Sequence, residues 1–336
     1  MKTTPFLSLL AICASFLLPT ATTRAEVSEV RIASQPGLGY MPIMVMQDQK
    51  LVEKQAAKLG IPDLKTTYYV FANGATITDG LLSGNLEFGS GSWSIFSTLW
   101  AKTQGGIGIK SPGSMNCMPL YLNTRNPNVK TLKDFTDKDK IALPTIKVSA
   151  QALALQQACE KEFGPGQYNK LDSITVSLSH PDGMAALLGG IGEINSHLTA
   201  PPYQEIELTK PGIHRVLNSY DTAGGAVTFN VFWGTQKFHD ANPKVFAAVA
   251  AALEEALDYI NKDHKAAAEA YLRVSKDKVS LEDTMKLLDD KEIEFGISPK
   301  NMMKGVDFLF RTGTIKTKPA DWKEMFFENV HSKPGS

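Results

Sequence analysis

The feature that most constrains the fold is a regular alternation of β-type and α-type segments over the first two thirds of the chain. Residues 27–111 alternate β-rich runs such as TTYYVFA (66–72) with helix-type runs such as SIFSTLWAKT (94–103), and residues 124–220 repeat this order. Strands that alternate with helices form a parallel sheet with helices on its faces. The sequence therefore predicts an α/β protein with two doubly wound lobes.

The last hundred residues read as helices. In the run HDANPKVFAAVAAALEEALDYINKD, apolar residues recur at spacings of three and four: Val245, Val249, Leu253, Leu257 and Ile260. This spacing places them on one face of a helix, and that face has to be buried. We expect these C-terminal helices to pack on the first lobe.

Two chain crossings, near residues 118–124 and 226–232, join the predicted lobes. Lobe 1 is expected to comprise residues 26–120 and 230–336, and lobe 2 residues 121–229. A cleft between two lobes is a common place for a ligand. In open α/β sheets ligands lie at the carboxyl ends of strands, so the loops that follow the strands are the places to look for a site.

The N-terminal segment has the pattern of a secretory signal peptide. Lys2 gives an early positive charge, Phe6–Leu18 is apolar, and a small-residue exit ends at Ala25. We expect cleavage after Ala25 and a soluble protein in the periplasm, since no later run has the roughly 18 apolar residues of a membrane span. The 35 basic and 35 acidic residues balance, so no basic field indicates nucleic acid as a partner.

The chain lacks the sequence patterns of the common enzyme and metal sites. There is no G-x-S-x-G, no H-E-x-x-H and no P-loop lysine pattern. Cys117 lies in an apolar run and Cys159 in a helical pattern, so we expect two buried free thiols and no metal site. We therefore expect neither an enzyme nor a bound cofactor.

The loop Gly89–Trp93 is the first candidate site in lobe 1. Its glycines allow close approach of the backbone, the hydroxyls of Ser90 and Ser92 can bond oxygen atoms, and Trp93 offers a flat apolar wall. The alternative is an ordinary strand-to-helix turn with a tryptophan in the core. Other strand-end loops and the crossings add the candidates Gln35, Leu38, Tyr40, Asn73, Met115, Asn116 and Asn230, the last of which also fits a hinge role.

In lobe 2 the run IALPTIKVSAQALALQQACEK (141–161) predicts a strand, a loop and a helix that starts after Ser149. Free N–H groups and the helix dipole favour an anion at such a start, so Ser149 and Ala150 are candidate ligand contacts. The alternative is that Ser149 only caps its own helix. His197 lies in a predicted cleft loop and could bond a carboxylate or sulfonate there, although a lone histidine is more often structural.

Five segments, in this order and spacing, resemble the periplasmic substrate-binding proteins of ABC importers in the nitrate, taurine and aliphatic-sulfonate group, also described as thiamine-pyrimidine-precursor-like. They are VRIASQPGLGYMPIMVMQDQKLVEK, DGLLSGNLEFGSGSWSIFSTLWAK, KTLKDFTDKDKIALPTIKVSAQALALQQACEK, MAALLGGIGEINSHLTAPPY and VTFNVFWGTQKF. The resemblance implies a two-lobed, type II-like clamshell without catalysis. The chain departs from the family pattern at residues 197–203, where relatives often have an aromatic and acidic segment.

The resemblance also implies a function and partners. We expect a monomer that captures a small organic anion, a sulfonate or a carboxylate, and delivers it to the transmembrane permease subunits. Met115 and Met118 add apolar lining, which favours a larger organic acid, such as an aromatic one, over nitrate or taurine. Two alternatives stay open: a protein that binds a pyrimidine precursor or takes part in its synthesis, although the iron-holding cysteine cluster of such relatives is missing, and a two-lobed sensor that meets a receptor.

Overall fold

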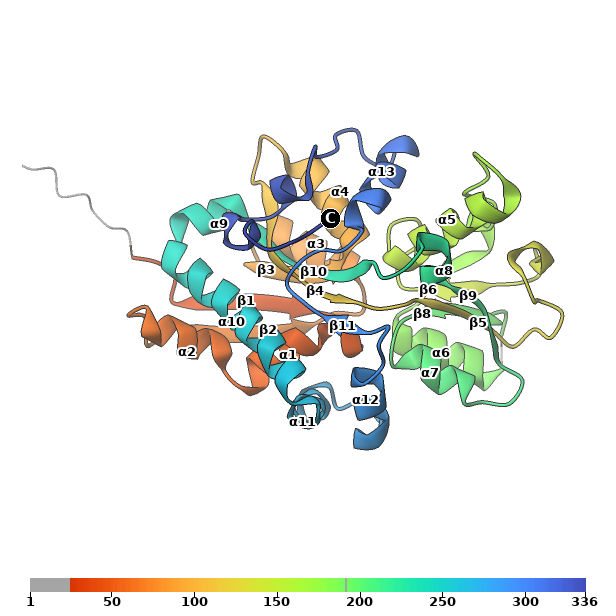
Figure 1. The fold of residues 1–336 in the computed structure, drawn as a ribbon, viewed down its shortest axis with the longest axis horizontal. Helices are drawn as coiled ribbons and strands as arrows, with labels where there is room; N and C mark the ends of the chain where they lie inside the picture. Colours follow the sequence, from red (N-terminus) through yellow and green to blue (C-terminus); the bar gives the residue numbers. More distant parts are fainter. Residues whose placement is uncertain (1–24, 191) are drawn as a thin grey trace, which may run out of the picture.

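The computed structural model describes residues 25–190 and 192–336, so the predicted signal peptide, apart from Ala25, lies outside the described residues. The strands of the described part form two sheets (Figure 1). The larger one has six strands, in the spatial order β11 (Glu294–Phe295), β4 (Ile109–Cys117), β10 (Thr228–Thr235), β3 (Phe88–Ser92), β1 (Glu29–Ser34) and β2 (Lys65–Val70).

The smaller sheet has five strands. Their spatial order is β7 (Thr175–Ser177), β6 (Ile141–Leu143), β8 (Ser196–Thr199), β5 (Tyr121–Thr124) and β9 (His214–Asn218). We call the six-stranded sheet with the helices that pack on it lobe 1, and the five-stranded sheet with its helices lobe 2. The smaller sheet is therefore built from one continuous stretch of chain, and the larger sheet from the segments before and after it.

Both sheets are mixed, whereas the sequence predicted parallel ones. In lobe 1, β1 is parallel to β2 and β3, but β10 runs antiparallel to β3 and β4. In lobe 2, β6 is parallel to β7 and β8, but β5 runs antiparallel to β8 and β9. Strands β5 and β10 both come directly after a crossing, so each enters its sheet from the other lobe, and the short edge strand β11 is also antiparallel to β4.

Helices cover both faces of each sheet (Figure 1). The helices of lobe 1 are α1 (Met41–Asp48), α2 (Leu51–Lys58), α3 (Gly74–Leu82), α4 (Trp93–Thr103), α9 (Gln236–Ala241), α10 (Pro243–Lys262), α11 (His264–Ser275), α12 (Leu281–Leu288) and α13 (Met302–Arg311). Those of lobe 2 are α5 (Ala150–Phe163), α6 (His180–Gly189), α7 (Tyr203–Leu208) and α8 (Ser219–Ala223). Among the C-terminal helices, α10 contacts α1 and α2, α11 contacts α1, and α13 contacts α4.

The local chemistry of several segments explains their structure. Helices α1 and α2 follow each other closely but are separated at Lys50, which adopts a left-handed backbone conformation with φ of 52°. The five apolar residues predicted for one face of α10 are all buried. Cys117 and Cys159 are free and buried, as expected. Among the described helices none is long and apolar enough to cross a membrane.

Candidate functional site

The two lobes touch each other on both sides of the strand ends. On one side, the backbone N–H of Leu38 in lobe 1 donates to the carbonyl oxygen of Pro201 in lobe 2 at 3.1 Å. On the other side, the hydroxyl of Ser94 at the start of α4 donates to the carbonyl oxygen of Val148, just before α5, at 2.7 Å. The structure is therefore a closed arrangement, and the residues between these two contacts are shielded from solvent.

Polar side chains from both lobes are buried at this junction, which we call the inner site. It is defined by Gln35, Tyr40, Ser92, Asn116 and Asn230 from lobe 1 and by Ser149, Gln151, His180, Thr199 and Tyr203 from lobe 2. All ten are less than a tenth exposed. Buried polar groups are costly unless they find hydrogen-bond partners, so the partners of each one are informative.

Asn230 is the most unusual member of the inner site. It lies in β10 opposite Ser92 of β3 and Asn116 of β4, so the three polar residues form a row across neighbouring strands. The side chain of Asn230 is fully buried, yet neither its amide oxygen nor its amide nitrogen has a partner among the described residues. A methyl group on Gly39 would overlap this amide, so only glycine leaves room for it there.

Asn116, its neighbour in the row, has the opposite character. Its amide nitrogen donates to the carbonyl oxygen of Gly39 at 2.6 Å, and its amide oxygen accepts from the backbone N–H of Asn230 at 3.3 Å. Asn116 therefore fixes the loop that follows β1 against β10. The two asparagines are neighbours in the sheet. The side chain of Asn116 is hydrogen-bonded within the protein, whereas that of Asn230 has no hydrogen-bond partner among the described residues.

The other polar side chains of lobe 1 are bonded to each other. The amide nitrogen of Gln35 donates to the hydroxyl oxygen of Tyr40 at 2.6 Å, and burial raises the pKa of the Tyr40 phenol. The hydroxyls of Ser92 and Ser94 are 2.9 Å apart, which links the end of β3 to the contact with lobe 2. These groups hold the strand-end loops in place and keep uncharged hydroxyls at the junction.

Lobe 2 contributes two further polar atoms that are buried and unpaired among the described residues, the amide nitrogen of Gln151 and the hydroxyl of Tyr203. Gln151 lies in the first turn of α5, and Tyr203 begins α7. The ring of Tyr203 stacks on that of His180, with centroids 5.6 Å apart, and Nδ1 of His180 is 2.6 Å from the hydroxyl oxygen of Thr199. Burial, and the nearby ring of His197, lower the pKa of His180 to about 3, so it is neutral at physiological pH.

The start of α5 has the geometry that the sequence predicted. The hydroxyl of Ser149 accepts from the backbone N–H of Ala152 at 3.2 Å, so this residue caps its own helix. The cap satisfies one N–H, and the N–H groups of Ala150 and Gln151 still belong to the first turn, where the helix dipole favours negative charge. The alternatives set out for Ser149 are thus compatible, because capping and a ligand contact by its neighbours use different groups.

Five of the predicted ligand-binding residues have other roles in the structure. The side chains of Leu38 and Met115 are part of the hydrophobic core. The hydroxyl of Ser90 donates to the carbonyl oxygen of Ala33 at 2.7 Å and ties β3 to β1. The side chain of Asn73 caps α3 by accepting from the N–H groups of Ala75 and Thr76.

His197 is the fifth. It lies within β8 rather than in a cleft loop, and its side chain is fully buried inside lobe 2. Its Nδ1 is 2.5 Å from Oε1 of Glu207, and its other ring nitrogen has no partner among the described residues. Glu207 also accepts from the amide of Asn123 at 2.8 Å. This network joins α7 to the sheet, which is a structural role.

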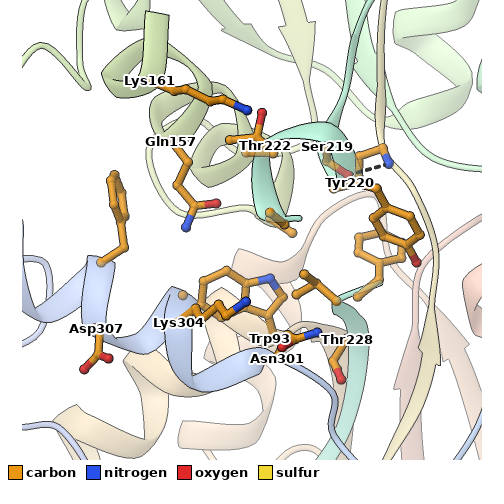
Figure 2. Close-up of a pocket in the computed structure, with 18 of the residues that line it drawn as sticks. Trp93, Gln157, Lys161, Ser219, Tyr220, Thr222, Thr228, Asn301, Lys304 and Asp307 are labelled. Carbon is orange, nitrogen blue, oxygen red and sulfur yellow. Dashed lines mark hydrogen bonds between the residues drawn. The ribbon is translucent and has the colours of Figure 1, made fainter. Parts of the chain in front are cut away.

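A space between the lobes lies close to the inner site, and we call it the groove. It has a volume of about 410 Å3, and its lining includes Trp93 and Ala150, which directly follow the inner-site residues Ser92 and Ser149 in the chain. Figure 2 shows Gln157 and Lys161 of α5 on one side, Asn301, Lys304 and Asp307 at α13 on the other, and Ser219, Tyr220 and Thr222 of α8 near the crossing. The sequence did not predict this space, because its walls come from helix faces rather than from strand-end loops.

The position of Trp93 depends on a glycine of α13. A methyl group on Gly305 would overlap the far edge of the Trp93 indole, so glycine at this position lets the helix pack directly on the ring. Trp93 is 5% exposed, which agrees with its role as a wall between the core of lobe 1 and the groove. The two interpretations of Trp93 that the sequence allowed, a core residue and a flat wall, both describe part of its surroundings.

Solved structures with the same fold include binding proteins for sulfonates and for nitrate. The alkanesulfonate-binding protein SsuA from Xanthomonas axonopodis pv. citri, bound to MOPS, is 16% identical, with a TM-score of 0.65 over 87% of this chain and 93% of its own. The nitrate-binding protein NrtA from Synechocystis PCC 6803 is 15% identical, with a TM-score of 0.68 over 92% and 86%. A Candida albicans gene product with the generic periplasmic binding protein fold is 14% identical, with a TM-score of 0.67 over 92% and 96%.

No family model matches the sequence, and no curated protein matches it. The similarity to the solved structures covers most of the chain, and at identities of 14–16% it establishes the fold. Those structures include the sulfonate and nitrate binders that the sequence segments resemble. The chain therefore has the two-lobed periplasmic binding protein fold.

Proposed function

We propose that this protein is the periplasmic solute-binding component of an ABC importer, and that it holds a small organic anion at the inner site for delivery to the permease. The observation that carries the proposal is the side-chain amide of Asn230, which is fully buried and has no partner among the described residues. Gln151 and Tyr203, from the opposite lobe, each add a buried polar atom in the same condition.

The energetic cost of such atoms supports a ligand. Leaving a buried donor or acceptor unpaired costs about 1–3 kcal/mol, and native proteins keep few such groups. A solute that bonded to Asn230 and to Gln151 or Tyr203 would remove this cost and would touch both lobes at once. A ligand that interacts with both lobes stabilises the closed form relative to the open one, which is the signal that a permease would need to read.

The anionic character of the solute rests on the helix starts at the junction. Helices α4 and α5 begin at Trp93 and Ala150, beside the contact between Ser94 and Val148. Their first N–H groups carry partial positive charge and favour a sulfonate or carboxylate. The inner-site side chains themselves are uncharged, with His180 kept neutral by burial, so backbone N–H groups would supply the attraction.

The same uncharged side chains favour one alternative, a pyrimidine-like solute. Amides and a phenol can both donate and accept hydrogen bonds, as the ring nitrogens and substituents of a pyrimidine require. The stacked rings of Tyr203 and His180 would offer such a ring an aromatic neighbour. A neutral pyrimidine in place of the anion would leave the binding role of the inner site unchanged.

The experiment is a thermal-shift screen of the purified protein against alkyl sulfonates, aromatic carboxylates, nitrate and pyrimidines, followed by calorimetry on the hits. A ligand that binds only the native state raises its stability by RT ln(1+[L]/Kd), so a hundredfold excess over Kd adds about 2.7 kcal/mol. We expect at least one organic anion to raise the melting temperature of the wild type and to fail with Asn230→Leu. If only pyrimidines raise the melting temperature, the solute is a pyrimidine and not an organic anion. If no solute raises it, the binding role is contradicted.

The cellular setting is part of the proposal. We infer export through the segment that ends at Ala25, and a monomeric protein with residues 26–120 and 230–336 in one lobe and 121–229 in the other. The N-terminal sequence of the protein recovered from a periplasmic extract tests the cleavage site, and light scattering of the same sample tests the monomer. Retention of residues 1–25 in the extract would contradict the signal peptide.

A further inference from the structure

The groove has the features of a second binding site, separate from the inner site. It lies between α5 and α8 of lobe 2 and α13 of lobe 1, and it is bordered by both crossings through Leu120 and Val227. Its volume of about 410 Å3 is within the range of small-molecule pockets. Because both lobes form its walls, anything that fills it contacts both of them.

The charged residues of the groove are not balanced. Glu160 forms an ion pair with Arg311, whose two guanidinium nitrogens donate to the Glu160 carboxylate oxygens at 2.7 and 2.8 Å. Asp307 forms an ion pair with Lys318, which lies outside the groove, with Nζ of Lys318 2.5 Å from Oδ1 of Asp307. Both acidic residues that line the groove are therefore already paired.

Two lysines are left over. Lys304 has no carboxylate partner among the described residues, and Lys161 donates only to the backbone carbonyl oxygen of Asp221, at 3.0 Å. Lys161 belongs to α5 of lobe 2 and Lys304 to α13 of lobe 1, so the two ammonium groups come from opposite walls (Figure 2). The groove thus carries positive charge that its own carboxylates do not neutralise, which favours an anion.

The rest of the lining is apolar and aromatic. Trp93, Phe229 and Phe308 line the groove, together with the side chains of Met118 and Ala154. Aromatic rings bind flat apolar surfaces well, since they bury a large area with few torsion angles to order. Gln157 and Asn301 add amide groups that can bond an oxyanion.

We propose that the groove binds a second solute, an aromatic carboxylate or sulfonate, with its ring against Trp93 and Phe308 and its anionic group beside Lys304 and Lys161. This site is additional to the inner site and depends on the closed lobes, not on the solute proposed for the inner site. A solute in the groove stabilises the same closed form as a solute in the inner site. The two sites therefore help each other, because each ligand favours the conformation that the other binds.

The test is calorimetry with 2-naphthalenesulfonate, and with 2-naphthalenemethanol as a neutral molecule of similar shape. We expect the sulfonate to bind the wild type and the alcohol to bind at least about tenfold more weakly, because only the sulfonate interacts with the lysines. Lys304→Glu and Lys161→Glu each should weaken the sulfonate about tenfold or more at low salt. Both residues are exposed, so these variants keep the fold.

Matched controls separate the groove from general charge effects and from the inner site. Lys316→Glu and Lys170→Glu make the same charge change at exposed lysines outside the groove, and they should leave the affinity within about twofold. Asn230→Leu removes the inner-site amide and should leave naphthalenesulfonate binding in place. Filling the groove with Ala154→Phe should abolish it.

The possible results sort cleanly. Loss of the sulfonate with the groove variants, together with its survival in Asn230→Leu, supports a second site. Loss in Asn230→Leu alone, with the groove variants unaffected, places the sulfonate in the inner site, so the second site is wrong while the proposed function stands. Three further results overturn the second site: equal effects of Lys304→Glu and Lys316→Glu on the affinity, equal affinities of the wild type for the alcohol and the sulfonate, or no binding of the sulfonate to the wild type.

Discussion

The inner site and the groove are neighbouring parts of one lobe junction, but they are built from different chemistry. The inner site buries uncharged amides and hydroxyls at the ends of strands, and three of its side chains have polar atoms without partners among the described residues. The groove is open, lined by aromatic rings, and bordered by lysines. The comparison teaches that one lobe junction can combine two environments, one suited to recognition through hydrogen bonds and one suited to recognition through charge and apolar area.

The largest expected effect distinguishes the two asparagines of the inner site. Asn230→Leu should weaken the inner-site solute about a hundredfold, or ~2.7 kcal/mol, because two hydrogen bonds to the ligand are lost. The free energy of unfolding of the ligand-free protein should not fall, since an unpaired buried amide is removed. Calorimetry and urea unfolding measure the two quantities.

Asn116→Leu is the matched control for that change. It breaks the bond to the Gly39 carbonyl and leaves the N–H of Asn230 unpaired, so the free energy of unfolding should fall by about 1–3 kcal/mol. If Asn230→Leu destabilises the ligand-free protein as much as Asn116→Leu does, the amide of Asn230 is structural and the inner site loses its main support.

The next effect concerns pH and belongs to the inner site alone. Burial lowers the pKa of His180 to about 3 in the folded protein, while an unfolded histidine has a pKa of about 6.5. Above pH 6.5 both states are neutral at this residue. As the pH falls below 6.5, this histidine takes up a proton in the unfolded state but stays neutral in the folded state. The free energy of unfolding therefore decreases, by about 2 kcal/mol between pH 6.5 and pH 5.

Urea unfolding at several pH values should show this loss in the wild type and a smaller loss in His180→Gln. Identical slopes for the wild type and His180→Gln would mean that His180 titrates normally and that the inner site is not sealed from water.

A smaller effect tests the packing of Trp93, which lines the groove. In Gly305→Ala the added methyl group overlaps the indole of Trp93, which has to move or force α13 away. We expect a loss of about 1–2 kcal/mol in the free energy of unfolding, typical of overpacking, and weaker binding of naphthalenesulfonate in the groove. Thr312→Ala, just after the same helix, is the control. Gly313→Ala would not serve, because Gly313 has φ of 76° and alanine would be strained there. Normal stability and binding in Gly305→Ala would mean that Trp93 does not form the wall.

The smallest effect concerns the ion pair at the end of the groove. Arg311 is largely exposed and its bond to Glu160 is screened by solvent, so Arg311→Met should change the free energy of unfolding by less than about 1 kcal/mol. Because this pair joins α13 to α5, its loss should still shift the ligand-free lobes toward an open form, which small-angle scattering measures as a larger radius of gyration. Arg311 also holds the pKa of Glu160 below its usual range, so the contribution is present at neutral pH and is lost as the pH falls through that lowered pKa.

The sequence predicted the two-lobed α/β fold and the strand-end position of the inner site, because both follow from local periodicity. The alternation of segments in 27–111 and the cap at Ser149 are local signals, and the structure agrees with both. The antiparallel placement of β10 did not follow, since strand pairing depends on residues more than a hundred positions apart. No sequence pattern selects Gln151 or Tyr203, because their unpaired atoms can be identified only in the folded molecule.

The groove was beyond prediction for a related reason. Its walls combine α5, α8 and α13 with both crossings, and no local motif marks the face of a helix that meets another lobe. His197 shows the opposite error. A histidine near a predicted strand end suggested a ligand contact, but the strand continues through it and Glu207 engages it inside lobe 2. Burial and partner choice, which decide such roles, are properties of the assembled molecule.

The interleaved order of the two sheets has a consequence for how the chain can fold. All five strands of the smaller sheet come from the continuous stretch Tyr121–Asn218, and its first and last strands pair with each other through Tyr121 and Asn218. The larger sheet needs β10 between β3 and β4, and then β11 at its edge. When the chain is synthesised from its N-terminus, lobe 2 can complete its sheet while β3 and β4 still lack β10, the strand that joins them. Lobe 1 is therefore synthesised first but completes its sheet last.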